Sequence, residues 1–164
     1  MNNLPAENNQ PVPFKNAFGL SVIEKSKVIE APAIFKYYLE ARYESPRLID
    51  LKPNAARNKI TEIILKLYTL TGYKIPEDDK SIGFMRDELY VQLKRKYVDI
   101  TISEIKQALE SGVNGEFKEI TGNLLGINVA NCMAWIFEYM RSQQRKDALS
   151  DAYDMFEQTL NPKS

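Results

Sequence analysis

Apolar residues in this chain recur at helical spacing, and Pro and Gly residues mark the ends of the segments that carry them. The clearest stripe has the spacing i, i+3, i+4 and i+7 and consists of Ile60, Ile63, Ile64 and Leu67. Pro53 suits the first turn of this helix, and Gly72 suits its end. No segment shows sustained alternation of apolar and polar residues between hairpin turns. The chain is therefore predicted to be all-α.

Caps and helix breaks predict further helices on either side of this one. Pro32 suits the first turn of a helix that ends before Ser45, because a residue that precedes proline avoids the helical region. Ser81 is predicted to cap a helix that ends near Tyr97 and that carries one apolar stripe.

Thr101 and Glu104 have the spacing of a capping box, in which the hydroxyl accepts from an unpaired amide and the carboxylate reaches back. The helix that they begin is predicted to end at Gly112.

The last helix is predicted to be the longest, with Asn128 as its N-cap. Its first apolar stripe consists of Val129, Met133, Ile136 and Met140. The polar residues 141–147 interrupt the stripe, so the helix either bends there or leaves the body of the domain. We expect a compact bundle of about five helices at residues 31–146, a flexible or loosely packed segment at 1–30, and a helical extension at 147–164.

Basic and acidic residues are equal in number, 22 of each, and the formal net charge is +0. A protein whose main work is coating nucleic acid has a global positive charge, which this chain lacks. The charges are unevenly placed, since residues 52–97 hold ten basic and six acidic side chains and residues 98–164 hold six and ten. This asymmetry can orient a partner, but helices with solvated charged faces also produce it.

The cysteine content and the hydropathy pattern indicate a soluble, cytoplasmic protein. The single cysteine, Cys132, excludes an intramolecular disulfide framework and fits a reducing compartment. The first ten residues have no basic leader, apolar core or small-residue cleavage site. The longest apolar runs are far shorter than the roughly 20 residues that span a bilayer.

The sequence offers few side chains for catalysis. It has no histidine, which removes the commonest general base and most zinc sites. Cys132 belongs to an apolar helical stripe, where a thiol is inert. The carboxylates of 77–79 and 87–88 are adjacent in sequence, so on a helix they point in different directions. We predict a protein that is not an enzyme and that binds no metal or cofactor.

Two groups of basic residues are candidates for contact with nucleic acid. They consist of Lys94, Arg95 and Lys96 at the end of one helix, and of Arg141, Arg145 and Lys146 in the polar interruption. Tyrosine or tryptophan lies near each group, and proteins grip single strands with aromatic and basic side chains together. Cations at a helix C-terminus also complement the helix dipole, so a structural role is the alternative.

The end of the last helix is a candidate for binding a protein partner. Its apolar face, at i, i+4, i+7 and i+11, consists of Leu149, Tyr153, Phe156 and Leu160. Such a face is suited to lie in a partner's groove or to pair with another copy of the chain. The alternative is that it folds back onto the first helices of the same chain.

The segment from Asp99 to Arg145 contains a pattern that consists of Thr101, Glu104, Ile105, Ala108, Gly112, Gly115, Glu116, Trp135, Ile136, Tyr139 and Arg145. In this pattern the segment resembles a group of small helical proteins carried by phages and mobile elements of Bacteroides-type bacteria. After the Gly-Glu pair, where that group tends to have Tyr-Gly, this chain has Phe117 and Lys118. The group is similar in turn to phage helicase-loader and replisome-organiser proteins.

The resemblance implies a non-enzymatic adaptor in phage or mobile-element DNA replication, located in the cytoplasm of a bacterial host. Its partner would be a replicative helicase or another replisome protein, with contact to single-stranded DNA as a secondary role. Two other functions stay open: a phage structural or assembly protein that acts through self-association, and a small DNA-binding regulator.

Overall fold

The computed structural model describes the backbone of residues 33–160 and their side chains, except those at 34, 152, 153 and 155–160. The helices are α2 (Ala33–Tyr43), α3 (Pro53–Thr71), α4 (Asp79–Lys96), α5 (Ile102–Val113), α6 (Lys118–Thr121), α7 (Val129–Arg141) and α8 (Gln143–Leu160), with the short 3-10 helix η1 (Leu48–Asp50). Within these residues there is no strand beyond one isolated bridge, which confirms the all-α prediction. The predicted N-terminal segment at 1–30 lies outside the described residues.

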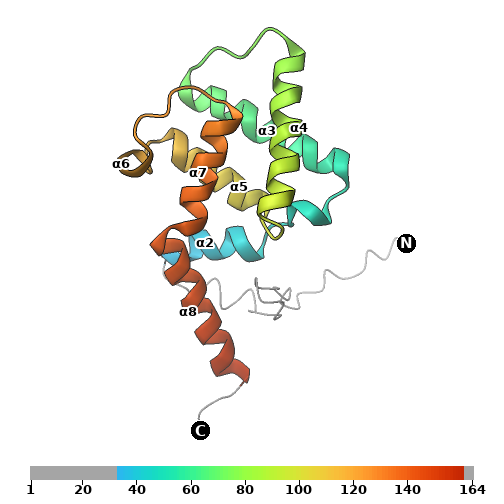
Figure 1. Cartoon of the computed structure of the whole chain (residues 1–164). Helices are drawn as coiled ribbons and strands as arrows, with labels where there is room; N and C mark the ends of the chain where they lie inside the picture. Colours follow the sequence, from blue (N-terminus) through green and yellow to red (C-terminus); the bar gives the residue numbers. More distant parts are fainter. Residues whose placement is uncertain (1–32, 161–164) are drawn as a thin grey trace, which may run out of the picture.

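Helix α5 occupies the middle of the bundle (Figure 1). It packs against α2, α3 and α7, while α3 also packs against α4, and α2 against α8. The apolar stripes predicted from the sequence meet in one core, to which Ile60, Ile64, Leu67, Leu89, Leu93, Ile105, Leu109 and Ile136 contribute fully buried side chains. Trp135 is 4% exposed and belongs to this core.

Most of the predicted helix ends are confirmed. Helix α3 begins at Pro53, and Gly72 ends it with a φ of 72°. Thr101 and Asn128 cap α5 and α7 through their side chains, each of which accepts a hydrogen bond from an amide three residues on. The predicted cap at Ser81 is wrong, because the Asp78 carboxylate caps the helix by accepting a hydrogen bond from the amide of Lys80, two residues further on, and α4 begins at Asp79.

Gly112 does not end α5, as the sequence suggested. The helix continues to Val113, and the positive φ of 81° falls on Gly115. A Cβ atom at position 112 would lie 2.1 Å from Cγ of Trp135, so glycine is needed there for close packing of α5 on α7. From the sequence alone, a glycine that is needed for close helix packing cannot be distinguished from one that ends a helix.

The last predicted helix is divided into α7 and α8. Ser142, within the predicted polar interruption, has extended φ and ψ angles of −60° and 138°, and α8 begins at the next residue. The first turns of α8 fold back on the body, where Ala148 is completely buried. The remainder of α8 runs outward past α2 (Figure 1). Among the described helices none is long and apolar enough to cross a membrane.

Candidate protein-binding surface

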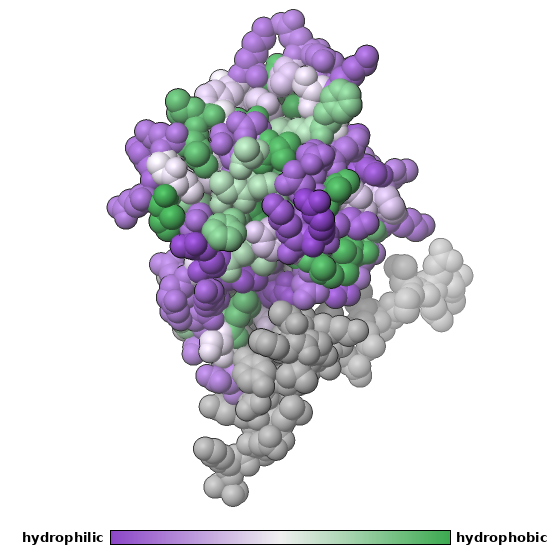
Figure 2. Space-filling model, viewed as in Figure 1, coloured by the Kyte–Doolittle hydropathy of each residue, from purple (hydrophilic) through white to green (hydrophobic). Residues whose placement is uncertain are grey.

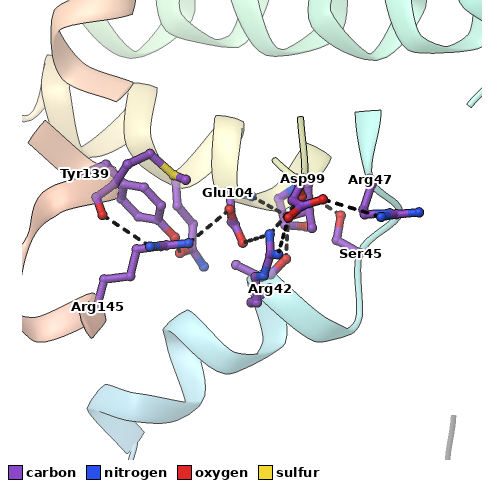
Figure 3. A network of polar contacts seen from close by, with 12 residues as sticks. Arg42, Ser45, Arg47, Asp99, Glu104, Tyr139 and Arg145 are labelled. Carbon is purple, nitrogen blue, oxygen red and sulfur yellow. Dashed lines mark hydrogen bonds and ion pairs between the residues drawn. The ribbon is translucent and has the colours of Figure 1, made fainter. Parts of the chain in front are cut away.

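A network of buried charges joins α2, α5 and α8 at the base of the bundle (Figure 3). Glu104 is its centre and is completely buried. Its Oε1 atom lies 3.3 Å from Nη1 of Arg42, and its Oε2 atom lies 3.5 Å from Nη2 of Arg145. Arg42 also donates to the main-chain oxygen of Asp99 at 2.8 Å, and the Asp99 carboxylate lies 3.5 Å from Nη1 of Arg47.

Burial and charge act on Glu104 in opposite directions. Burial raises the pKa of its carboxyl group, and the guanidinium groups of Arg145 and Arg42 lower it. Removing one partner of a buried ion pair is costly, whereas the complete set adds less to stability than its short distances suggest. The network therefore fixes how α2, α5 and α8 are arranged, and we assign it a structural role.

Arg145 corrects one of the predicted nucleic-acid contacts. Its side chain is 10% exposed, pairs with Glu104, and donates to the main-chain oxygen of Met140 at 3.2 Å. Its guanidinium carbon lies 5.7 Å from the centre of the Tyr139 ring. A side chain held in this way is not free to bind phosphate. The sequence could not reveal this, because Glu104 is far away along the chain.

The other predicted basic residues are exposed. Lys94, Arg95 and Lys96 form no ion pair within the described part of the chain, and Nζ of Lys94 lies 4.9 Å from the centre of the Tyr90 ring. Arg141 pairs with Glu138 at 3.3 Å, and Lys146 is exposed on α8. The end of α4 and the α7–α8 junction lie apart (Figure 1), so the structure does not bring the two groups into one surface.

The predicted partner-binding face of α8 is described in part. Leu149 is half-buried on α8. The structure describes the backbone of Tyr153, Phe156 and Leu160 as part of α8, but not their side chains.

An apolar groove lies between α3, α4 and the start of α7. Its volume is about 550 Å³, and its apolar walls consist of Tyr68, Pro76, Ile82, Phe84, Met85, Ile127 and Val129. Phe84 stands at its edge with 72% of its surface exposed, while Met85 beside it is buried. Hydrophobic surface is visible over α4 and α7 among hydrophilic residues (Figure 2). We call this feature the α4–α7 groove.

The α4–α7 groove was not predicted from the sequence. One signal was present: Phe84 lies off the buried stripe of α4, which Met85, Leu89 and Leu93 form, so a large aromatic side chain was left without a place in the core. The other walls come from α3 and α7, and a sequence does not show which helices meet.

The described residues offer little for chemistry. Burial raises the pKa of the Cys132 thiol to about 12, so the thiol is protonated and a poor nucleophile at neutral pH. No three metal-ligating side chains converge within residues 33–160. The absence of a cofactor and of enzymatic activity stays a prediction for the whole chain.

Comparisons with protein-family models, with curated proteins and with solved structures found no match to this chain.

Proposed function

We propose that this chain is a non-enzymatic adaptor in phage or mobile-element DNA replication, and that it binds a replicative helicase or another replisome protein through the α4–α7 groove. The groove, with Phe84 exposed at its edge, is the observation that carries the proposal. The resemblance of the segment from Asp99 to Arg145 supports the replication context.

The shape and chemistry of the groove favour the apolar face of a partner helix. Helices bind such grooves through large side chains spaced three or four residues apart. Exposed aromatic residues next to a buried apolar floor are typical of residues that contribute most to binding. Phe84 has this position, because Met85 and Tyr68 form a buried floor beside it.

The charges around the groove favour a partner helix with basic residues on its flanks. Glu88 is the charged residue among its walls, and Asp78 and Asp79 begin α4 just beyond Pro76. Complementary charge increases the association rate and selects the orientation of the partner more than it adds affinity. Lysine or arginine residues beside the apolar anchors would therefore face these carboxylates.

Titration of the full chain against the purified replicative helicase of the same replicon, followed by biolayer interferometry, tests the proposal. We expect saturable binding, and Phe84→Glu should weaken it by about tenfold or more, because a charge cannot enter an apolar site without loss. Val98→Glu is the matched control, since Val98 is 55% exposed and lies outside the groove. No binding by the native chain, or equal loss in both variants, contradicts the proposal.

Self-association is the second candidate function. The observation that favours it is the outward course of α8 past α2 (Figure 1). Sedimentation equilibrium of the full chain separates the two functions, because a stable dimer that binds no helicase favours assembly.

A further inference from the structure

A second cavity, which we call the junction pocket, lies where α2, α5, α7 and α8 come together. Its volume is about 380 Å³, and its charged walls are Glu116, Glu138 and Arg141. The other walls that matter to its chemistry are Tyr38, Phe117, Tyr139 and Ser142. It shares no wall residue with the α4–α7 groove, so it is an independent site.

The walls of the junction pocket are rich in hydrogen-bond acceptors. The Tyr38 hydroxyl donates to Oε1 of Gln144 at 3.2 Å, and the Tyr139 hydroxyl donates to Oε1 of Gln107 at 2.8 Å. Each phenol donates its only proton in these bonds, so its oxygen can take part in further hydrogen bonds only as an acceptor. The Ser142 hydroxyl oxygen is buried and makes no hydrogen bond of good geometry within the described residues, although it lies near the Tyr38 hydroxyl. A ligand that only donates hydrogen bonds would satisfy these atoms.

The charge of the pocket is negative. Glu116 is exposed and forms no ion pair within the described part of the chain, and after burial it is the largest cause of the raised pKa of Tyr38. Glu138 is buried, and its Oε2 atom lies 3.3 Å from Nε of Arg141. Arg141 balances one of the two carboxylates. Arg145, whose guanidinium carbon lies 5.7 Å from the centre of the Tyr139 ring, is matched by Glu104.

Aromatic rings add to the attraction for a cation. The rings of Tyr38 and Tyr139 lie 5.9 Å apart between centres, at an angle of 42°. Tyr139 is 2% exposed and its ring already faces Arg145, so the half-buried rings of Tyr38 and Phe117 are the ones that a ligand can reach. The face of an aromatic ring attracts a cation, and the attraction grows when the cation leaves water. Carboxylates next to aromatic faces favour a guanidinium or ammonium group over an anion or an apolar group.

We propose that the junction pocket binds the side chain of an arginine residue on a partner protein. Guanidinium has five N–H donors and no acceptor, which matches the acceptor-rich walls, and its flat face stacks on aromatic rings. Its positive charge pairs with Glu116. This inference does not depend on the proposed function of the α4–α7 groove, because the two cavities share no wall residue.

Titration of the ¹⁵N-labelled full chain with N-acetyl-arginine amide, followed by NMR, tests this inference. N-acetyl-citrulline amide is the control, because it has nearly the same shape without the charge. We expect saturable shifts at Glu116, Phe117 and Ser142 with the arginine probe, and affinity lower by about fivefold or more with citrulline. Equal affinity for the two probes, or shifts with arginine that lie elsewhere, would overturn the inference.

A pair of neighbouring variants shows whether Glu116 is responsible. Glu116→Gln should lower the affinity for the arginine probe by about three- to tenfold, since it removes the unpaired carboxylate. Glu119→Gln removes an exposed charge three residues away that does not line the pocket, and it should have no effect. Equal loss in the two variants would mean that net charge attracts the probe, and would also overturn the inference. Glu116 is exposed, so folding of the variant can be checked directly by circular dichroism.

Discussion

At the scale of single residues, the contact between Gly112 and Trp135 determines how closely α5 and α7 approach. The Cβ atom of an alanine at position 112 would lie 2.1 Å from Cγ and 2.7 Å from Cβ of the buried Trp135. The indole cannot move away without displacing other core residues, because protein interiors are closely packed. A residue with any side chain at this position therefore forces the two helices apart.

We predict that Gly112→Ala lowers the free energy of unfolding by about 1–3 kcal/mol or more, despite the better helix propensity of alanine. Gly83→Ala is the matched control, since Gly83 also lies inside a helix and its added Cβ would meet nothing closer than Arg86 at 3.7 Å. That change should stabilise by about 0.5–1 kcal/mol. Urea denaturation measures both, and a neutral Gly112→Ala variant would show that α5 and α7 are not in contact there.

At this scale the sequence predicts contacts between near neighbours in the chain, but not the contact of Gly112 with Trp135. Caps that depend on near neighbours in the chain, such as Thr101 and Asn128, were predicted correctly because donor and acceptor are three residues apart. The role of Gly112 depends on Trp135, and that of Arg145 depends on Glu104. These pairs are distant in sequence, so pattern and spacing contain no information about them.

At the scale of helices, Glu104 ties three elements together through a single carboxylate. Arg42 belongs to α2 and Arg145 to α8, and both pair with Glu104 on α5. The sequence predicted Glu104 as part of a capping box, and the Thr101 half of that prediction is confirmed. The interruption of the last helix was also predicted, because a run of polar residues breaks an apolar stripe wherever it lies. The packing of α8 on α2 could not be predicted in this way, because it depends on the pairing of Arg42 and Arg145 with Glu104, which lies far from both in the sequence.

We predict that Glu104→Gln destabilises the chain by about 3–5 kcal/mol at neutral pH, because it leaves two buried guanidinium groups without their shared carboxylate. Amide hydrogen exchange should show the first turns of α8 and α2 opening before α3 and α5. The double variant Glu104→Gln, Arg145→Met should recover part of the loss, since it removes one of the two like charges. Glu62→Gln, which breaks an exposed pair with Lys59, should change stability by about 1 kcal/mol or less. A similarly small cost for Glu104→Gln would mean that its carboxyl is protonated in the folded chain.

At the scale of the whole molecule, the candidate binding features are separate surfaces of an all-α chain whose formal net charge is +0. The α4–α7 groove is apolar with an acidic neighbourhood, the junction pocket is acidic and aromatic, and the end of α4 is basic. The sequence predicted the fold class and most helices, because these follow from local periodicity. It did not predict the groove or the pocket, since each is assembled from at least three helices.

Only one of the two predicted basic groups keeps all its side chains available for nucleic acid. Lys94, Arg95 and Lys96 are exposed at the end of α4 and unpaired within the described residues, whereas Arg145 is buried and Arg141 is paired. Three cations can neutralise about three phosphates. For a single strand, the logarithm of the binding constant should then fall with the logarithm of salt concentration with a slope of about −2.

We predict weak binding of single-stranded DNA at low salt, measured by fluorescence anisotropy, and its loss in the triple variant Lys94→Gln, Arg95→Gln, Lys96→Gln. A control with the same change in net charge replaces Lys36, Lys59 and Lys74, which pair with carboxylates on their own segments. If the patch at the end of α4 holds the strand, the control retains most of the affinity when the two variants are compared at about 0.1 M salt, where charge elsewhere is screened beyond about 10 Å. Arg145→Met should leave the salt slope unchanged, since that side chain faces Glu104 and not the solvent. Absence of binding at low salt, or equal loss in the two triple variants, would remove DNA contact through this patch from the activities of the isolated chain.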